Sequence, residues 1–587
     1  MSALTDVEQV APEAALKVER LTVEVGTGAA SRYLVRDISF AVEAGKTLCI
    51  AGESGSGKSI TSLAIMGLLP RAARVAAGVV RFGGSDLTTL KQSQMEAIRG
   101  KQIAMIFQEP MTSLNPLMTV GQQLAETLRR HEHADKRAAR AASLAMLEAV
   151  HMTEAARRLD QYPHELSGGM RQRVMIAMAM LCKPRVLIAD EPTTALDVTV
   201  QAQILELMRE LQREFGTAMV MITHDMGVVA EMADEIAIMQ QGELREIATA
   251  RKLFREPKHD YTKALLAAVP MPGTQPAPES RAEEPVVLRV EHLAVRFPMR
   301  KEGWGAQQYL HAVEDVSFEL RRGETLGLVG ESGCGKSTTG KALINMVPYE
   351  GSIQLFGREL NGCDRAALQE ARRDVQMIFQ DPYASLNPRK TVLDLVGEPL
   401  LIHQQMPLGQ RTERVAALLE QVGLSADVMK RYPHQFSGGQ RQRICIARAL
   451  SLNPKIIVAD ESVAALDVSI RAQVLEIFEQ LQREHQISYV FVSHDMSVIE
   501  RVCHRVAVMY GGRIVEIGRR DRVLKHPQHP YTRRLLDAVP IPDVDFKRDF
   551  RSLLKDIERR NPVYPEGYLP PKPVFDAVAE DHYVAVQ

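Results

Sequence analysis

The stretch GESGSGKS at residues 52–59 is repeated almost letter for letter as GESGCGKS at residues 330–337. Each copy follows a short apolar run, KTLCIA (46–51) or ETLGLV (324–329), which predicts a buried strand. A segment with helical spacing comes next in both copies, so the glycine-rich turn opens a helix. A strand, a loop of backbone N–H groups and a helix N-terminus together form an anion site. The pattern therefore predicts two phosphate-binding loops of the P-loop type.

The loop residues have different predicted contacts with a nucleoside triphosphate. The ammonium groups of Lys58 and Lys336 can reach β- and γ-phosphates, while the hydroxyls of Ser59 and Ser337 can ligate Mg²⁺. The predicted nucleotide contacts are Gly52, Glu53, Ser54, Gly55, Ser56, Gly57, Lys58, Ser59 and Ile60 in the first copy, and Gly330, Glu331, Ser332, Gly333, Cys334, Gly335, Lys336, Ser337 and Thr338 in the second.

A second pair of strand signals leads into acidic residues. VLIADE (186–191) and IIVADE (456–461) each place an apolar run before two carboxylates. Asp190 and Asp460 are placed to hold Mg²⁺, and Glu191 and Glu461 to polarise an attacking water. In isolation such a strand ends in two solvated acids, but a P-loop lies upstream in both copies. We therefore expect two hydrolytic sites.

The repeat extends over most of the chain. The P-loop lysines are 278 residues apart, and from Ser167 and Ser437 onward the offset is constant at 270. Between the copies lies PMPGTQPAPESRAEEP (270–285), which predicts a semi-rigid exposed linker. We expect a flexible N-terminus at 1–14, domains at 15–250 and 286–525, an extension and linker at 251–285, and a second extension with a C-terminal tail at 526–587.

Composition excludes several classes of protein. The 587 residues carry 72 Lys and Arg against 73 Asp and Glu, so no basic surplus points to nucleic acid. No apolar run is long enough for a membrane helix, and the N-terminus MSALTDVEQVAPEAA lacks a signal core, which together predict a cytosolic location. The six cysteines are scattered without zinc spacing. HEHADKRAAR (131–140) predicts a solvated helical face rather than a metal site.

LSGGMRQR (166–173) and FSGGQRQR (436–443) resemble the signature sequence of ATP-binding-cassette proteins. The chain also has residues similar to that family's Q-loop glutamine (Gln108, Gln380), D-loop (ALD at 195–197 and 465–467) and switch histidine (His224, His494). The resemblance implies an α/β fold: two tandem P-loop nucleotide-binding domains, each with a helical subdomain and a short C-terminal extension.

In this family two domains pair head to tail, so the resemblance implies that each ATP lies between one P-loop and the other domain's signature turn. The implied signature contacts are Ser167, Gly168 and Gly169 in the first copy, and Ser437, Gly438 and Gly439 in the second. The implied Mg²⁺ ligands are Ser59, Gln108 and Asp190, and Ser337, Gln380 and Asp460. The family also stacks an aromatic residue on adenine. Phe297 fits that place in the second copy, whereas the first has Val25 there, with Tyr33 as a weak substitute.

The segments after the Q-loop glutamines, EPMTSLNP (109–116) and DPYASLNP (381–388), are similar to those of bacterial dipeptide and oligopeptide importers. So are the extensions HDYTKALLAAVP (259–270) and HPYTRRLLDAVP (529–540). Within that family the fused layout, ADESVAALD and the ending DHYVAVQ look most like an importer of glutathione. No cysteine cluster for iron–sulfur occurs in either extension.

The resemblance implies an energy-coupling ATPase for small peptides, with ATP and Mg²⁺ as cofactors. Its implied partners are two membrane-spanning permease subunits and, indirectly, a periplasmic or lipoprotein binding protein. It would lie at the cytoplasmic face of the inner membrane, contacting neither nucleic acid nor the transported substrate. Whether the fused chain closes on itself or pairs with another copy stays open. The alternative is a soluble twin-cassette ATPase of translation or DNA repair.

Overall fold

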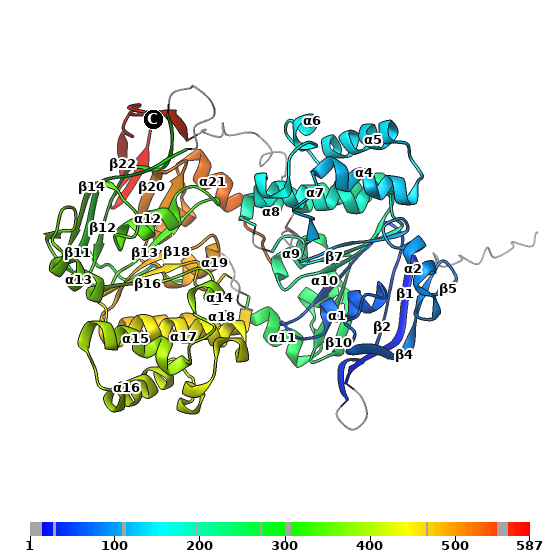
Figure 1. The fold of residues 1–587 in the computed structure, drawn as a ribbon, viewed down its shortest axis with the longest axis horizontal. Helices are drawn as coiled ribbons and strands as arrows, with labels where there is room; N and C mark the ends of the chain where they lie inside the picture. The colour runs from blue at the N-terminus through cyan, green and yellow to red at the C-terminus, as the bar shows by residue number, and fades with distance from the viewer. Residues whose placement is uncertain are drawn as a thin grey trace, which may run out of the picture. The chain divides into compact units, whose positions relative to one another are not determined.

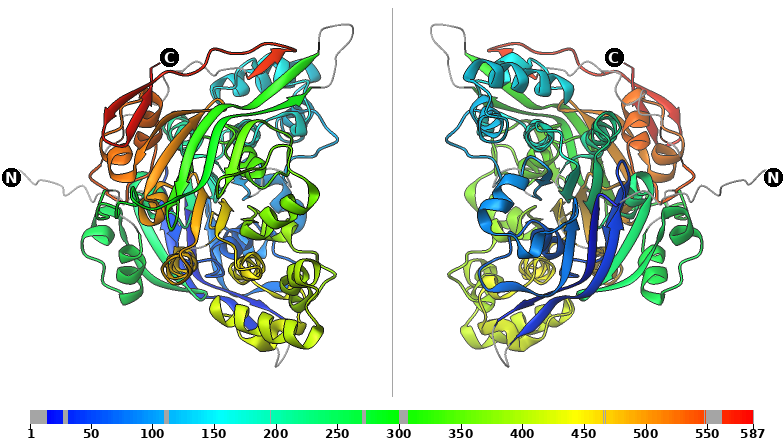
Figure 2. Two further views of the ribbon diagram at one scale, coloured as in Figure 1. Left: turned by 90° about the vertical axis from the view of Figure 1, so that its left-hand side faces the viewer. Right: turned by 90° about the vertical axis from the view of Figure 1, so that its right-hand side faces the viewer.

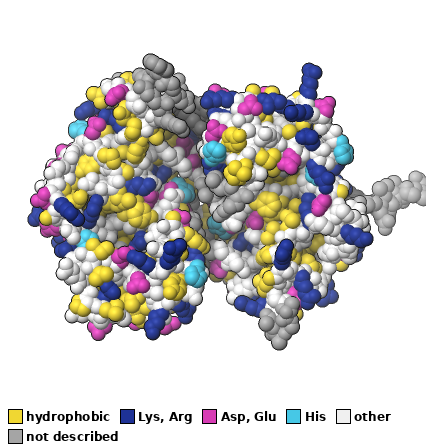
Figure 3. Space-filling model, in the orientation of Figure 1, with side chains coloured by type: hydrophobic (Ala, Val, Ile, Leu, Met, Phe, Trp, Pro, Cys, Tyr) yellow, Lys and Arg dark blue, Asp and Glu magenta, His cyan; other side chains and the backbone are white. Residues whose placement is uncertain are grey.

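The computed structural model describes residues 14–26, 31–108, 113–194, 196–269, 273–299, 307–464, 466, 468–546, 548 and 562–586. The chain forms two compact units (Figure 1). The first comprises Met1–Leu196, Val200–Val269 and Pro540–Phe550, and the second comprises Asp197–Thr199, Pro270–Val539 and Arg551–Gln587. Each unit contains one of the two phosphate loops, as the repeat predicts. Side chains of both charge signs are interspersed over the face shown in Figure 3.

The first cassette contains a mixed sheet and an antiparallel sheet. In the six-stranded sheet, of order β10-β9-β3-β8-β7-β6, all strands are parallel except β10. The antiparallel sheet has the order β2-β1-β4-β5. The strands are β1 (Leu16–Val25), β2 (Arg32–Val42), β3 (Thr47–Ala51), β4 (Ala73–Phe82), β5 (Ser85–Asp86), β6 (Ile103–Ile106), β7 (Val186–Asp190), β8 (Ala218–Ile222), β9 (Glu235–Gln240) and β10 (Glu243–Thr249).

The central strands β3, β7 and β8 are buried at every position, which explains their continuous apolar sequences. Their alternating side chains enter two separate cores. Leu48 and Ile50 pack toward the antiparallel sheet, whereas Cys49 and Ala51 pack toward the helices that follow β6. Because successive side chains of a strand face opposite sides, one short strand anchors both layers.

The helices of the first cassette include a subdomain, α4 to α7, inserted between β6 and β7. Its core contains Leu124, Leu147 and Val174, all fully buried. The helices are α1 (Lys58–Ile65), α2 (Gln92–Ile98), α4 (Val120–His131), α5 (Lys136–Ala149), α6 (Ala155–Arg158), α7 (Gly168–Met180), α8 (Val198–Phe215), α9 (Met226–Met232), α10 (Ala250–Arg255) and α11 (Asp260–Ala267).

The prediction of one helical face over residues 131–140 is wrong. Helix α4 ends at His131, His133 has a left-handed φ of 52°, and α5 begins at Lys136. The Asp135 side chain caps α5 by accepting a hydrogen bond from the Ala138 N–H at 2.8 Å. An N-cap aspartate within the stretch therefore separates two helices.

The second cassette repeats this plan with longer sheets. Its strands are β11 (Val286–Pro298), β12 (Gln308–Arg321), β13 (Thr325–Val329), β14 (Glu350–Leu355), β15 (Arg358–Glu359), β16 (Val375–Ile378), β17 (Ile456–Asp460), β18 (Ser488–Val492), β19 (Arg505–Tyr510) and β20 (Arg513–Arg519). Its helices are α12 (Lys336–Leu343), α13 (Arg365–Asp374), α14 (Pro382–Ser385), α15 (Val392–Gln404), α16 (Leu408–Gln421), α17 (Gly438–Leu450), α18 (Val468–His485), α19 (Met496–Val502), α20 (Arg520–Lys525) and α21 (Pro530–Asp537).

The C-terminal tail adds three strands to the second cassette. Strand β21 (Val563–Pro565) pairs with β12, and the hairpin of β22 (Phe575–Ala579) and β23 (His582–Ala585) pairs with β20. Figure 2 shows this red hairpin beside the orange strand β20. The tail thus covers sheet edges whose backbone groups would otherwise lack partners.

The segment Pro540–Phe550 follows the second extension in sequence but groups with the first cassette. Asp545 forms ion pairs with Arg251 and Arg255 on α10, and Arg548 pairs with Glu231 on α9 at 3.4 Å. A similar contact involves the linker. Glu500 on α19 accepts the N–H groups of Gly273 and Gln275 at 3.0 and 3.2 Å. The sequence predicts an extension and tail over 526–587, and the structure divides that stretch between the two units.

Candidate active sites

Each phosphate loop has a backbone that only glycine can adopt. Gly52 has a φ of 147°, and a Cβ atom there would lie 2.1 Å from the carbonyl oxygen of Met239. Gly330 repeats this arrangement, with a φ of 149° and a distance of 2.2 Å to the carbonyl oxygen of Met509. The loop therefore lies directly against the neighbouring strand and presents its backbone without intervening side chains.

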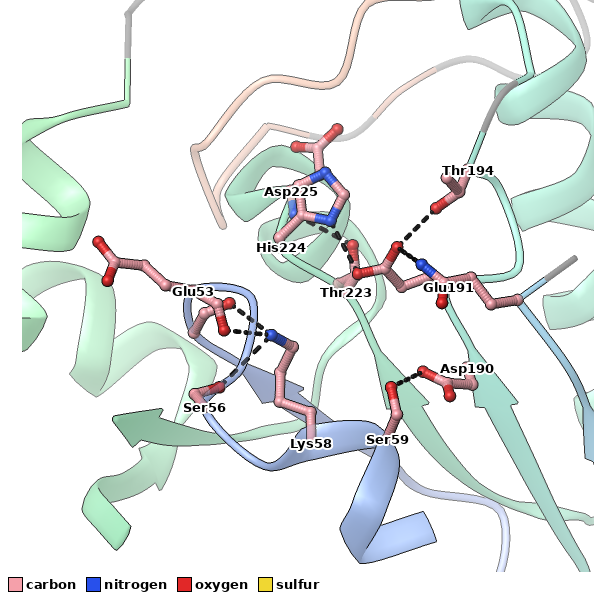
Figure 4. A network of polar contacts seen from close by, with 12 residues as sticks. Glu53, Ser56, Lys58, Ser59, Asp190, Glu191, Thr194, Thr223, His224 and Asp225 are labelled. Atoms are coloured by element: carbon pink, nitrogen blue, oxygen red, sulfur yellow. Dashed lines mark hydrogen bonds and ion pairs between the residues drawn. The ribbon is translucent and has the colours of Figure 1, made fainter. Parts of the chain in front are cut away.

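The lysine of each loop turns back onto the loop itself. The Lys58 ammonium donates to the carbonyl oxygens of Gly52 at 2.7 Å and Glu53 at 2.8 Å (Figure 4). The Lys336 ammonium makes the same two bonds, at 2.7 and 2.9 Å. Both side chains are nearly fully buried. The positive charge is thus held at the mouth of the loop, where an anion would be bound.

The loop serine and the strand-end aspartate lie side by side, as the sequence predicts. Ser59 Oγ donates to Asp190 Oδ1 at 3.1 Å, and Ser337 Oγ donates to Asp460 Oδ1 at 2.8 Å. Burial raises the pKa of Asp190 to about 6, against the opposing hydrogen bond from Ser59. Burial raises the pKa of Asp460 as well. A hydroxyl beside a buried carboxylate is an oxygen-donor set that suits Mg²⁺.

The first glutamate lies at the centre of a polar network. Glu191 accepts hydrogen bonds from Gln108 Nε2 at 2.8 Å and Thr194 Oγ1 at 2.9 Å, and its Oε1 lies 3.0 Å from His224 Nδ1. Figure 4 shows its carboxylate between His224 and Thr194. Burial alone would raise the pKa of Glu191, but the hydrogen bond and charge of His224 outweigh it and lower the pKa to about 2. This carboxylate is therefore ionised.

The second glutamate has the same network with one contact fewer. Glu461 accepts a hydrogen bond from Gln380 Nε2, and its Oε1 lies 3.3 Å from His494 Nδ1. Its pKa is lowered, because the interactions with His494 outweigh burial. Ala464 stands where the first cassette has Thr194. The Ser462 hydroxyl, which follows Glu461, is buried and has no hydrogen-bond partner among the described residues.

Both glutamates have an unusual backbone. Glu191 has a φ of 47° and Glu461 has a φ of 44°. Both values lie in the left-handed region that residues other than glycine seldom adopt. The N–H of each donates to the adjacent parallel strand, to Ile222 and Val492 respectively, both at 2.9 Å. Strained backbone of this kind clusters at functional sites.

The two signature turns form helix N-termini. Ser167 caps α7 by accepting the N–H of Met170, and Ser437 caps α17 by accepting the N–H of Gln440, both at 3.4 Å. Figure 1 places α7 and α1 in different parts of the first cassette. The structure therefore does not join Ser167 to the Lys58 network of its own cassette, and a composite site stays a prediction.

The residues considered for adenine lie on the antiparallel sheets. Phe297 is partly buried on β11 against the core of the second cassette. Tyr33 on β2 is exposed, with the Arg36 guanidinium 5.0 Å from its ring centre. Tyr33 also lines a cavity of about 170 Å³ together with Arg36, Gly242 and Glu243.

Two contacts escaped the sequence analysis. Thr194 binds the catalytic-site glutamate directly, although its position in ADEPTTALD carries no separate signal. The hydroxyl groups of Tyr261 and Tyr531, in the extensions, bind the N–H groups of Glu53 and Glu331 in the phosphate loops. The repeated H-x-Y-T of the two extensions was the available signal for this second contact.

Comparison with known proteins agrees with this geometry. The family model described as ABC transporter matches residues 35–194 and 313–464. The model of the oligopeptide/dipeptide transporter C-terminal region matches residues 245–291 and 515–561. Across the described residues, the helices are all too short or too polar to span a bilayer.

Curated relatives match along nearly the whole chain. The glutathione import ATP-binding protein GsiA of Pectobacterium atrosepticum is 51% identical, over 94% of this chain and 93% of its own. GsiA of Escherichia coli K12 is 49% identical, over 97% of this chain and 96% of its own. The chain therefore belongs to the ABC transporter family, as two fused ATP-hydrolysing cassettes that each carry the oligopeptide/dipeptide transporter C-terminal region.

Proposed function

We propose that this chain is the energy-coupling subunit of an importer for small peptides, with glutathione as the first candidate cargo. The observation that carries the proposal is the end-to-end similarity to glutathione import ATP-binding proteins, with both cassettes and both extensions included. The soluble alternative in translation or DNA repair is not favoured, because neither function accounts for two transporter-type extensions.

Within each cassette the geometry supports one division of labour. Glu191 and Glu461, ionised and oriented by His224 and His494, would accept a proton from the attacking water. Ser59, Asp190 and Gln108 would hold Mg²⁺ in the first site, and Ser337, Asp460 and Gln380 in the second. The ion would supply neutralisation of phosphate charge. The ammonium groups of Lys58 and Lys336 would leave the loop carbonyl oxygens and bind phosphate oxygens instead.

We further propose that each ATP site is completed by the opposite cassette's signature turn. Ser167 and Gly169 would complete the site of Lys336, and Ser437 and Gly439 the site of Lys58. The supporting observation is that each turn opens a helix of 13 residues, whose N-terminus attracts anions. A γ-phosphate would then bind both cassettes, and its loss on hydrolysis would release them.

The partners in this proposal are two permease subunits in the inner membrane, whose cytoplasmic face the chain would contact. A periplasmic or lipoprotein binding protein would deliver the peptide from the other side. The chain itself would touch neither the peptide nor nucleic acid. Its cargo specificity would therefore be a property of the whole complex.

The test is ATP turnover of the chain reconstituted in lipid with the proposed permease subunits. A binding protein loaded with glutathione or with a dipeptide is added on the opposite face. Stimulation by the glutathione-loaded protein alone would support the proposal and its cargo. Stimulation by the dipeptide alone would support the importer and reject glutathione. If neither the membrane subunits nor any loaded binding protein changes the ATP turnover, the proposed importer function is rejected.

A further inference from the structure

Each C-terminal extension reaches back to the phosphate loop of its own cassette through a tyrosine. Tyr531 Oη accepts the N–H of Glu331 at 2.9 Å, and Tyr261 Oη accepts the N–H of Glu53 at 3.3 Å. Both glutamates directly follow the first glycine of the loop. The same contact thus occurs twice, between segments 200 and 208 residues apart in sequence.

The lysine of the loop holds the same residue from its other side. Lys336 Nζ donates to the carbonyl oxygen of Glu331, and Lys58 Nζ donates to that of Glu53. A lysine that turns toward a phosphate has to leave this carbonyl. The tyrosine does not, because its partner is a backbone N–H that points toward the extension. The tyrosine contact to this part of the loop is thus independent of where the lysine points.

The extension is built to hold the tyrosine in place. His529 Nδ1 caps α21 by accepting the N–H of Tyr531 at 3.2 Å, and Glu516 accepts the N–H groups of Gln528 and His529 at 2.9 and 3.0 Å. In the first cassette His259 caps α11 and accepts the Tyr261 N–H at 3.1 Å, and Glu246 accepts the N–H groups of Lys258 and His259. The repeated histidine and tyrosine thus have separate tasks.

The second cassette has the tighter arrangement. Tyr531 is 1% exposed and its ring centre lies 4.5 Å from that of Tyr510, whereas Tyr261 is half-buried. The C-terminal hairpin adds His582, whose Nε2 lies 2.8 Å from Glu516 Oε1 in a fully buried pair. Glu516, which holds the second extension, is therefore itself bound by His582 near the end of the chain.

We propose that Tyr531 and Tyr261 are positioning residues of the ATP sites, which hold each phosphate loop in its anion-binding shape from the extension. The inference depends on ATP binding by the cassettes and is independent of the cargo. Because the hydroxyl groups bind the loop backbone, the two tyrosines would set nucleotide affinity through the shape of the loop. The extension is in this sense a structural part of the site.

The test measures binding of a fluorescent ATP analogue to the full chain with Mg²⁺. In a Lys58→Ala background, which silences the first loop, Tyr531→Phe should weaken binding about five- to tenfold, the usual effect of one lost hydrogen bond. Tyr489→Phe is the matched control. This buried tyrosine lies on β18 of the same cassette and not in the extension. Its hydroxyl donates to the Phe478 carbonyl oxygen at 3.4 Å.

Thermal unfolding of both variants separates positioning from general stability. The proposal expects similar melting temperatures for Tyr531→Phe and Tyr489→Phe, with weakened binding only in Tyr531→Phe. Unchanged affinity in Tyr531→Phe, or an equal loss in both variants, would overturn it. If Tyr531→Phe fails to fold, the test uses Tyr261→Phe in a Lys336→Ala background. Because this hydrogen bond is longer, we expect a loss of about two- to fourfold in affinity for the ATP analogue. Unchanged affinity would refute the proposal.

Discussion

Asp234 in the first cassette and His504 in the second make the same pair of hydrogen bonds. Asp234 Oδ2 accepts the N–H of Thr47 at 2.9 Å, and His504 Nδ1 accepts the N–H of Thr325 at 3.0 Å. The backbone N–H of each also donates to the carbonyl oxygen of the same threonine. Both threonines begin the strand that leads into the phosphate loop. A carboxylate and an imidazole thus make the same contacts in the two repeats.

The second cassette should therefore lose stability in weak acid. Burial lowers the pKa of His504 to about 4, and the nearby Arg281 and Arg520 act in the same direction. The unfolded chain takes up this proton near pH 6.5, whereas the folded chain resists until about pH 4. The resulting stability is complete above pH 6.5 and is lost as the pH falls toward 4. Over that window we expect a loss of about 2–3 kcal/mol.

Chemical denaturation at several pH values between 7 and 4.5 measures this loss. His504→Asn keeps an oxygen acceptor near the Thr325 N–H but cannot bind a proton, so the variant should show a shallower pH dependence. Identical pH profiles for the variant and the wild type would rule out His504 as the cause.

Replacing the glutamates at both sites should reduce turnover and leave nucleotide binding intact. Glu191→Gln and Glu461→Gln remove the ionised carboxylate but keep its hydrogen-bonding shape. Because a positioned general base contributes about 10²–10⁴-fold, we expect the double variant to lose at least a hundredfold in turnover. ATP affinity, measured with a fluorescent analogue, should change less than threefold.

The single variants then test whether both sites hydrolyse. Each should retain part of the turnover if the sites act separately. Glu461→Gln leaving the rate unchanged would show that the second site, with Ala464 and the unpaired Ser462 hydroxyl, is catalytically silent.

The second glycine of the signature turn should be the sensitive one for folding. A Cβ atom on Gly439 would lie 2.5 Å from Ile470 Cγ2, whereas a Cβ atom on Gly438 would have no neighbour within 4 Å. Gly439→Ala should cost about 1–3 kcal/mol of unfolding free energy by overpacking, and Gly438→Ala less than about 0.5 kcal/mol. Denaturation of the two variants in parallel gives the comparison. Equal losses of unfolding free energy in the two variants would mean that α17 and α18 can move apart to accommodate the added methyl group.

The segment that returns to the first cassette should be displaced by a small change on α9. A Cβ atom on Gly227 would lie 2.8 Å from both Cβ and O of Pro540. We expect Gly227→Ala to speed hydrogen exchange of residues 543–546 about tenfold, because the clash removes their support. Gly409→Ala is the control, since its added Cβ meets open space on α16. Unchanged exchange at residues 543–546 would show that Asp545 and Arg548 suffice to hold the segment.

Much of the plan was predictable because short motifs determine it. The glycines of the loop, the apolar run before Asp190 and the repeat register identify two P-loop domains, and the structure places the serine, aspartate, glutamate and histidine together. These are local patterns whose chemistry depends on a few adjacent residues. The strained φ of Glu191, by contrast, gives no signal in the letters around it.

The unpredicted parts depend on contacts across long sequence distances. The sequence predicts only a C-terminal tail at the end of the chain, yet β21 to β23 extend two sheets, because open strand edges elsewhere in the fold accept them. The described residues of the linker are mostly exposed, as the sequence predicts, but the binding of its backbone by Glu500 was not predicted. No periodicity within either stretch records the partner. The repeated H-x-Y-T marks the two tyrosines, but it does not identify the phosphate loops as their partners.

The placement of Pro540–Phe550 also has a consequence for biosynthesis. A ribosome releases the chain from its N-terminus, and domains generally fold as they emerge. The first cassette, however, receives its last packed segment only after most of the second cassette has been synthesised. Its α9 and α10 surfaces, with Gly227, Arg251 and Arg255, are therefore uncovered until the segment that begins at Pro540 has been synthesised. A nascent chain stalled before residue 540 would therefore keep that surface exposed to solvent.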